Sequence, residues 1–130
     1  GDVTGSHRLW RHPKTKQRIG SGVIHEGQIY IHNDPGVAEC FDVLKGEVKW
    51  EQRLSGAGKW VNWSSVMLSD GLCYSMNQGG DCFVFRAAPK FELVSVNSLG
   101  EPTNSSVAAS NGWLFLRTHQ NLWCIGGKRD

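Results

Sequence analysis

The chain has 130 residues, with 14 lysines and arginines against 12 aspartates and glutamates and a formal net charge of +2. This balance excludes an extended basic surface for nucleic acid or an acidic membrane, and no apolar run approaches the length of a membrane span. The length predicts one domain, while 16 glycines against four prolines, together with six tryptophans, predict many short strands rather than long helices.

The first predicted element stands apart from the others. Residues 1–12 carry Thr4-Gly5 followed by Trp10, a spacing similar to that of Lys45-Gly46 and Trp50 further along. We therefore expect this segment to be the outer strand of a preceding unit whose inner strands are missing. It contains no apolar core of a signal peptide.

Three similar units follow, over residues 20–55, 63–98 and 104–127. Each opens with a serine and a short apolar strand, which leads into a polar-glycine turn, a second strand, a second turn and a third strand. The first turns are Glu26-Gly27, Asp70-Gly71 and Asn111-Gly112. Such dipeptides supply the positive backbone dihedrals that a tight hairpin needs.

The later strands of each unit are predicted from apolar runs. Second strands are expected over 28–32, 72–76 and 113–117, third strands over 39–42, 82–86 and 122–125, and outer fourth strands over 47–53 and 92–97. The third unit is too short for a fourth strand.

The spacing of the units indicates the fold. Gly27 and Gly71 are 44 residues apart, and Gly71 and Gly112 are 41 apart. A period in the forties with short antiparallel strands is typical of β-propeller blades. A β-sandwich with similar hairpins is the alternative, but serine, glycine and aromatic residues recur in the same order three times. The predicted fold is an all-β, incomplete propeller of about three four-stranded antiparallel blades.

The stretch CFDVLKGEVKW, which begins at Cys40, joins the third strand of the first unit to its fourth. Asp42 can accept hydrogen bonds from amides of the following turn, and Gly46 allows the left-handed conformation of that turn. Trp50, on the outer strand, can pack against the neighbouring blade. These three residues are predicted to be structural.

This stretch resembles the tryptophan-docking motif AxDxxTGxxxW of pyrroloquinoline quinone (PQQ) type β-propellers. Asp42, Gly46 and Trp50 match the motif, whereas Cys40 and Lys45 replace its alanine and threonine. The second unit, with VFRAAPKFELV, has lost the motif. The overall pattern is most similar to that of proteins like the outer-membrane assembly factor BamB.

The resemblance implies a non-catalytic scaffold for protein–protein interaction, exported to the bacterial periplasm. The alternative that it implies is a fragment of a PQQ-dependent dehydrogenase, whose catalytic groups lie in missing blades. Such an enzyme needs PQQ on an aromatic floor, a calcium ion and an aspartate base. The carboxylates here are scattered over turns without calcium-ligand spacing. We therefore expect no catalytic, cofactor or metal residue in this chain, with PQQ and calcium only if the alternative holds.

The loop AGKWVNWSS, between the first two units, is the candidate binding site. Loops of this kind line the central opening of a propeller, and Trp60, Asn62 and Trp63 could present rings to a protein or a glycan. Packing between blades is the alternative, and it suits Trp63 better than Trp60. Glycan binding is accordingly a third functional hypothesis.

The chain has four cysteines: Cys40, Cys73, Cys82 and Cys124. Their spacing matches no metal site, and each lies in an apolar strand, which predicts four small buried side chains. Disulfides are the alternative in an exported protein. A turn centred on Gln78-Gly79 would pair Cys82 with Ser75 and make Cys73 its diagonal neighbour on the same face.

An arc of three blades leaves two blade faces exposed, because a closed propeller has about four to eight blades. Exposed apolar faces of this kind mark association sites. We expect the chain to be a C-terminal piece of a larger propeller, because its first residues begin within a blade. Head-to-tail self-association that closes a ring is the alternative.

Overall fold

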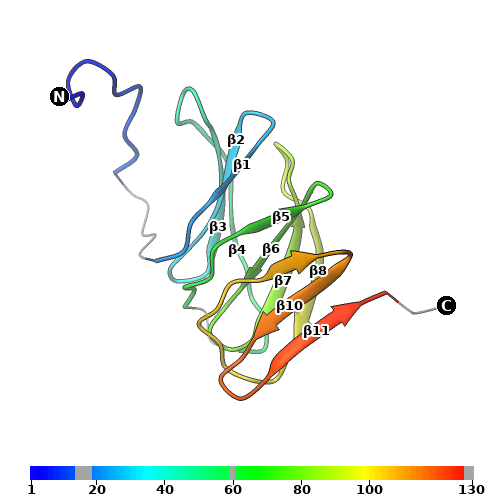
Figure 1. The fold of residues 1–130 in the computed structure, drawn as a ribbon. Helices are drawn as coiled ribbons and strands as arrows, with labels where there is room; N and C mark the ends of the chain where they lie inside the picture. Colours follow the sequence, from blue (N-terminus) through cyan, green and yellow to red (C-terminus); the bar gives the residue numbers. More distant parts are fainter. Residues whose placement is uncertain (14–18, 59–60, 128–130) are drawn as a thin grey trace.

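The computed structural model describes residues 1–13, 19–58 and 61–127, which form eleven β-strands and no helix (Figure 1). Two sheets have four strands, in the orders β1-β2-β3-β4 and β5-β6-β7-β8, and a third has the order β9-β10-β11. All the strand pairs are antiparallel, and within each sheet every strand pairs with the next one in the chain, as in propeller blades. The predicted fold, an unclosed arc of β-propeller blades, is confirmed.

The first sheet contains β1 (Val23–His25), β2 (Gln28–Asn33), β3 (Val37–Asp42) and β4 (Val48–Arg53). Its first turn has positive φ angles of 47° at Glu26 and 74° at Gly27, as the sequence predicts for a tight hairpin. A β-bulge follows Cys40 on β3, which lies opposite Trp50.

The second sheet contains β5 (Met67–Ser69), β6 (Leu72–Met76), β7 (Asp81–Arg86) and β8 (Leu93–Ser98). The third contains β9 (Ala108–Ser110), β10 (Trp113–Arg117) and β11 (Leu122–Gly126). Their first turns repeat the positive φ angles of the first sheet at Asp70-Gly71 and Asn111-Gly112. The three units thus begin with the same local geometry.

Two hydrophobic clusters fill the seams between successive sheets. The larger lies between the first and second sheets and includes Tyr30, Cys40, Phe83 and Phe85, with Trp50 packed against it. The smaller lies between the second and third sheets: Met76, Cys82, Val107 and Leu116. Burial between blades, rather than within one blade, therefore holds the arc together.

Corresponding serines also link the blades. The amide of Ser21 donates to Oγ of Ser65 at 2.9 Å, and the amide of Ser65 donates to Oγ of Ser106 at 2.8 Å. These are the serines that open the three units. Their hydroxyls satisfy backbone donors where each blade enters the arc.

The segment expected to be an outer strand, residues 1–12, contains no strand. Its backbone forms a turn, in which the amides of Ser6 and His7 donate to the carbonyl of Val3. An outer strand needs a third strand beside it to satisfy its ladder hydrogen bonds, and no such strand lies there in the described structure.

The cysteine predictions need two corrections. Cys82 lies opposite Met76 rather than Ser75, because the turn between β6 and β7 is one residue longer than predicted. Cys73 and Cys82 consequently belong to different seams, not to one face. All four cysteines are free, but Cys124 is exposed, since no further sheet covers its side of the third blade in the described structure.

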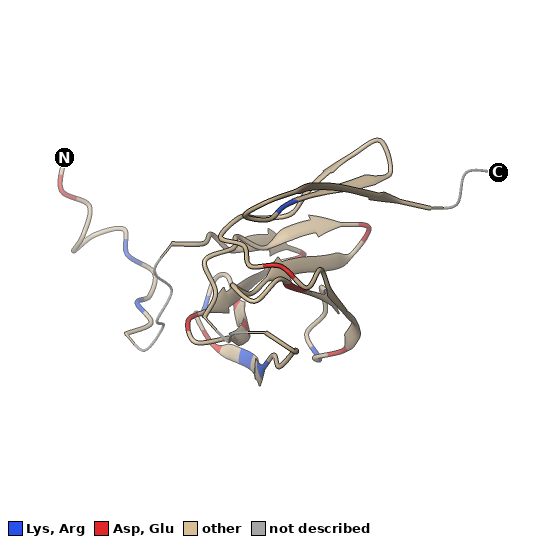
Figure 2. Cartoon of the chain, turned by 90° about the horizontal axis from the view of Figure 1, so that it is seen from below, with Lys and Arg blue, Asp and Glu red and all other residues tan. Residues whose placement is uncertain are grey.

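Charged residues of both signs are scattered over the turns and strands of the described chain, rather than gathered on one face (Figure 2). Among the described residues, no helix could span a membrane.

Candidate protein-binding surface

The turn that carries the tryptophan-docking motif is fixed by its own carboxylate. Oδ1 of Asp42 accepts hydrogen bonds from the amides of Lys45 at 2.8 Å and Leu44 at 3.0 Å. The Lys45 amide is the main cause that lowers the pKa of Asp42. Gly46 has a φ of +70°, which glycine adopts without a steric cost.

Trp50 closes the seam between the first two blades. Its Nε1 donates to the carbonyl oxygen of Ala88 at 2.9 Å, across the seam. Its ring lies 6.2 Å from Tyr30, 5.9 Å from Phe85 and 5.0 Å from Phe91, centroid to centroid. Ring contacts and one directed hydrogen bond together fix the angle between the blades.

Trp10 contacts the other side of the first blade in a similar way. Its Nε1 donates to the carbonyl oxygen of Val43 at 2.9 Å. Its ring lies against Gly46, where a β-carbon would come within 2.5 Å of the ring atom Cδ2. Gly46 thus serves two purposes: it allows the turn, and it leaves space for the incoming indole.

The outward side of the first blade, which no other sheet covers in the described structure, carries an apolar patch. Ile29, Ile31 and Phe41, with Trp10 and His12 over them, line a hollow of about 110 Å³. His12 meets Phe41 edge-on, with ring centroids 4.9 Å apart. We call this surface, formed by Ile29, Ile31, Phe41 and the adjoining Glu39 and Glu51, the first-blade face.

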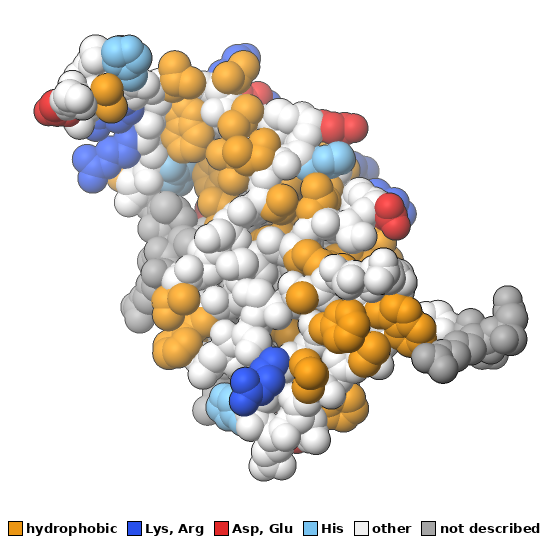
Figure 3. Space-filling model, in the orientation of Figure 1, with side chains coloured by type: hydrophobic (Ala, Val, Ile, Leu, Met, Phe, Trp, Pro, Cys, Tyr) orange, Lys and Arg blue, Asp and Glu red, His pale blue; other side chains and the backbone are white. Residues whose placement is uncertain are grey.

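Hydrophobic side chains gather at two places in Figure 3, over β1 and β2 and over β10 and β11. Ile24 is 62% exposed on β1, and Leu122 is 70% exposed on β11. Both ends of the arc therefore present apolar surface to solvent.

A carboxylate pair lies beside the apolar patch. Glu39 lies opposite Glu51 across β3 and β4, and both line a hollow of about 250 Å³ with Asp34 and Arg53. Glu39 is only 6% exposed. Burial, and then the like charge of Glu51, raise the pKa of Glu39 to about 7. This end of the first-blade face is therefore acidic and sensitive to pH near neutrality.

The sequence gives one signal of Glu39, a carboxylate within the apolar run VAECF on β3. The sequence reasoning missed it as a site residue, because alternation along a strand does not show which face a neighbouring sheet leaves uncovered.

The predicted binding loop has a mixed outcome. Trp60 lies outside the described residues. Asn62 is buried, and its Nδ2 donates to the carbonyl oxygen of His32 at 2.5 Å. Trp63 is 37% exposed. Asn62 and Trp63 thus differ in exposure, and the role of the three predicted residues in binding stays a prediction.

His32 forms part of the polar core next to this loop. Its Nδ1 lies 2.8 Å from Oγ of Ser75, across the seam, and its ring meets Phe83 edge-on. Burial lowers the pKa of His32 to about 4, an effect that the Gly36 backbone opposes. His32 is therefore neutral at physiological pH.

The fit of the described residues to a calcium ion can be judged from their donor sets. Calcium takes six to eight oxygen ligands, several of them carboxylates. In the described ranges, no three histidine, cysteine, aspartate or glutamate side chains lie together in a way that could hold a metal ion. The prediction that PQQ and calcium belong only to the dehydrogenase alternative stays a prediction.

No protein-family model and no curated protein matches the sequence. Many solved structures resemble the chain in fold. BamB from Moraxella catarrhalis is 11% identical, with a TM-score of 0.69 over 91% of this chain and 35% of that one. Quinohemoprotein alcohol dehydrogenase from Comamonas testosteroni is 16% identical, with a TM-score of 0.61 over 79% and 17%.

A europium-containing methanol dehydrogenase is 12% identical, with a TM-score of 0.62 over 80% of this chain and 20% of that one. The chain thus spans about a third or less of the length of each of these structures. At such identities the likeness concerns the fold alone. The chain has the fold of the PQQ-like β-propeller proteins, to which BamB and these dehydrogenases belong.

Proposed function

We propose that the chain is a non-catalytic PQQ-like propeller scaffold that binds protein in the bacterial cell envelope, with the first-blade face as its binding surface. One observation carries this proposal. Trp10, on a segment without strand structure, docks on this face through the same kind of indole–carbonyl bond that joins the first two blades. The face therefore accepts a tryptophan-bearing segment that forms no strand in the described structure.

The chemistry of the face suggests the class of segment that it takes. The apolar patch of Ile29, Ile31 and Phe41 suits aromatic side chains, and Glu39 and Glu51 lie beside it. The segment that covers it here is Trp10-Arg11-His12, which combines rings with a cation. A partner with aromatic and basic residues is the complement of this surface.

The partner takes one of two forms in this proposal. Further blades of a longer chain would cover the face as one blade covers the next, and a second copy would cover it head to tail. Export to the periplasm is part of the same proposal, and it rests on the likeness to BamB in fold.

A photo-crosslinking amino acid at position 31 tests the proposal in the native envelope. We expect a covalent product with one defined polypeptide. The same amino acid at position 44, a turn residue that is 70% exposed, should give no such product. Light scattering on the purified chain shows whether a second copy is the partner.

A dye-reduction assay tests the non-catalytic assignment of this chain. The chain is supplied with PQQ, calcium and a primary alcohol, and reduction of an artificial electron acceptor is followed. Turnover above the rate without protein would contradict the non-catalytic assignment. The absence of any crosslink at position 31 would contradict the first-blade face as the binding surface.

A further inference from the structure

Ser95 occupies, on the second blade, the place that Trp50 occupies on the first. Trp50 lies opposite Cys40 and Ser95 lies opposite Val84, and in both sheets a β-bulge follows at once. The second blade therefore directs a small hydroxyl side chain to its seam, where the first blade directs an indole.

A cavity of about 370 Å³ lies at this place, between the second and third sheets. Two of its walls correspond to rings that Trp50 contacts in the first seam. Tyr74 stands at the repeat position of Tyr30, and Ile125 stands at that of Phe85. The first seam shows what these positions accommodate, because the Trp50 ring lies about 6 Å from both of its partners.

The residues that line the cavity suit an uncharged, apolar ligand. None of the residues lining the cavity carries a charge, and most of them are aliphatic. At its edge, Nδ2 of Asn97 donates to Oγ of Ser95 at 3.1 Å. Oδ1 of Asn97 is thereby available to accept a hydrogen bond from a ligand N–H group.

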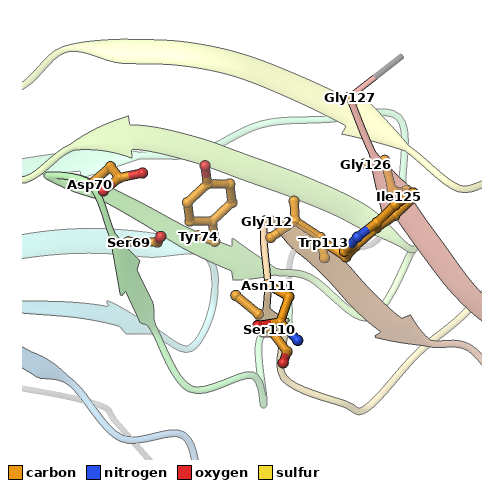
Figure 4. A pocket seen from close by; sticks show the side chains of 12 residues that line it. Ser69, Asp70, Tyr74, Ser110, Asn111, Gly112, Trp113, Ile125, Gly126 and Gly127 are labelled. Atoms are coloured by element: carbon orange, nitrogen blue, oxygen red, sulfur yellow. The ribbon is translucent and has the colours of Figure 1, made fainter. Parts of the chain in front are cut away.

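A second hollow, of about 460 Å³, adjoins the cavity and shares Tyr74, Leu114 and Ile125 with it. Figure 4 shows Tyr74 between Asp70 on one side and Trp113 on the other. The cavity can therefore be reached from the side where the first turns of the second and third blades lie.

We propose that this seam cavity binds a small, neutral, bicyclic aromatic molecule of the indole class. The ring lies between Tyr74 and Ile125, and its N–H group donates to Asn97. The volume lies within the range of small-molecule sites, and apolar cavities of smaller volume than this bind aromatic rings. Tyr74 and Ile125 both belong to this chain, and the inference goes beyond the scaffold function proposed above.

Calorimetry with indole as the probe tests the proposal on the full chain. We expect a dissociation constant of about 1 mM or tighter. Ser95→Trp, which restores the ring of the first seam, should weaken binding at least tenfold and raise the melting temperature. Val96→Trp is the matched control, because it adds the same ring on the opposite face of β8 and should leave binding unchanged.

Methyl NMR locates the ligand and covers the case in which Ser95→Trp fails to fold. Indole should shift the methyl signals of Leu114 and Ile125 and leave those of Ile29 and Ile31 in place. Ser95→Leu, a smaller filling of the cavity, should reduce these shifts.

Three results would overturn the proposal: no binding of indole, shifts confined to Ile29 and Ile31, or unchanged binding by the folded Ser95→Trp protein. N-acetyltryptophanamide carries the same ring on a peptide unit. Tighter binding of this compound than of indole would make the occupant a peptide side chain and would also overturn the proposal.

Discussion

Trp10 and Trp50 donate their indole N–H groups to backbone carbonyls at adjoining points of the repeat, each at 2.9 Å. The amide of Val43, whose carbonyl receives Trp10, donates to Gly27 as the amide of Ala87 donates to Gly71. Trp50 reaches its acceptor from a β-strand, and Trp10 reaches its acceptor from a segment without one. The receiving blade, rather than the conformation of the incoming segment, therefore defines the docking point.

The two tryptophans should differ in their contribution to stability. Trp50→Ala removes a ring that contacts both blades of a closed seam and should cost about 3 kcal/mol, at the low end for a large aromatic side chain because the ring is only partly buried. Trp10→Ala should cost about 1 kcal/mol, because its ring lies on the outside of the arc. Urea unfolding of the three proteins measures both values.

Trp50→Phe separates the ring from its hydrogen bond. It keeps an apolar ring in the seam and removes the N–H donor to Ala88. We expect Trp50→Phe to lower the free energy of unfolding by less than Trp50→Ala does. Equal losses for Trp10→Ala and Trp50→Ala would contradict the distinction between a closed seam and an open face.

The serines that open the blades should act as links rather than as local caps. Ser65→Ala removes the acceptor of the Ser21 amide, and Ser106→Ala removes that of the Ser65 amide. Each should cost about 0.5–1 kcal/mol and speed hydrogen exchange at the amide that loses its acceptor. Ser21→Ala is the control, because its hydroxyl accepts no bond of this kind from a described residue. Unchanged exchange at residue 21 in Ser65→Ala would refute the link.

The repeat made most of the fold predictable from the sequence. The dipeptides Glu26-Gly27, Asp70-Gly71 and Asn111-Gly112 identify the first hairpin of each blade, because few residue pairs adopt their dihedrals. The role of Asp42 in its turn also follows from local chemistry, since its acceptor atom and donors lie within three residues.

The features that the sequence did not predict depend on contacts between blades. Asn62 is buried in a loop between blades, where its side chain bonds to the carbonyl oxygen of His32, and Glu39 is buried on a face that no other sheet covers in the described structure. Strand alternation does not predict either of these environments. The register of Cys82 depends on the length of one turn, and a shift of one residue moves a side chain to the other face.

Glu39 should make the fold less stable as the pH rises. Its pKa in the folded state, about 7, lies above its ordinary value of 4.5, so the folded state binds the proton more tightly than the unfolded state does. Stability should therefore fall as pH rises from about 4.5 to about 7, and then level off. Glu39→Gln removes this loss, so it should melt a few degrees higher than wild type at pH 8 and at a similar temperature at pH 4.

Glu51→Gln tests the cause of this shift. Removal of the like charge opposite Glu39 should lower the pKa of Glu39 part of the way toward its ordinary value, because burial remains. Carboxyl-directed NMR titration measures the change directly. A Glu39→Gln protein that melts below wild type at pH 8 would contradict the raised pKa of Glu39 in the folded state.

His32 should oppose Glu39 in acid. Its pKa in the folded state, about 4, lies below its ordinary value of 6.5, because the neutral ring is buried against Ser75 and Phe83. The unfolded state therefore binds the proton more tightly, and stability should be lost as pH falls from about 6.5 to about 4. In wild type the gain from Glu39 partly cancels this loss over the same range.

Thermal melts of Glu39→Gln should therefore show a steeper decline in melting temperature below pH 6.5 than wild type does. Glu39→Gln combined with His32→Gln should show a shallower decline than Glu39→Gln alone. A decline of the same slope in the two Glu39→Gln proteins would show that His32 is not the group that titrates.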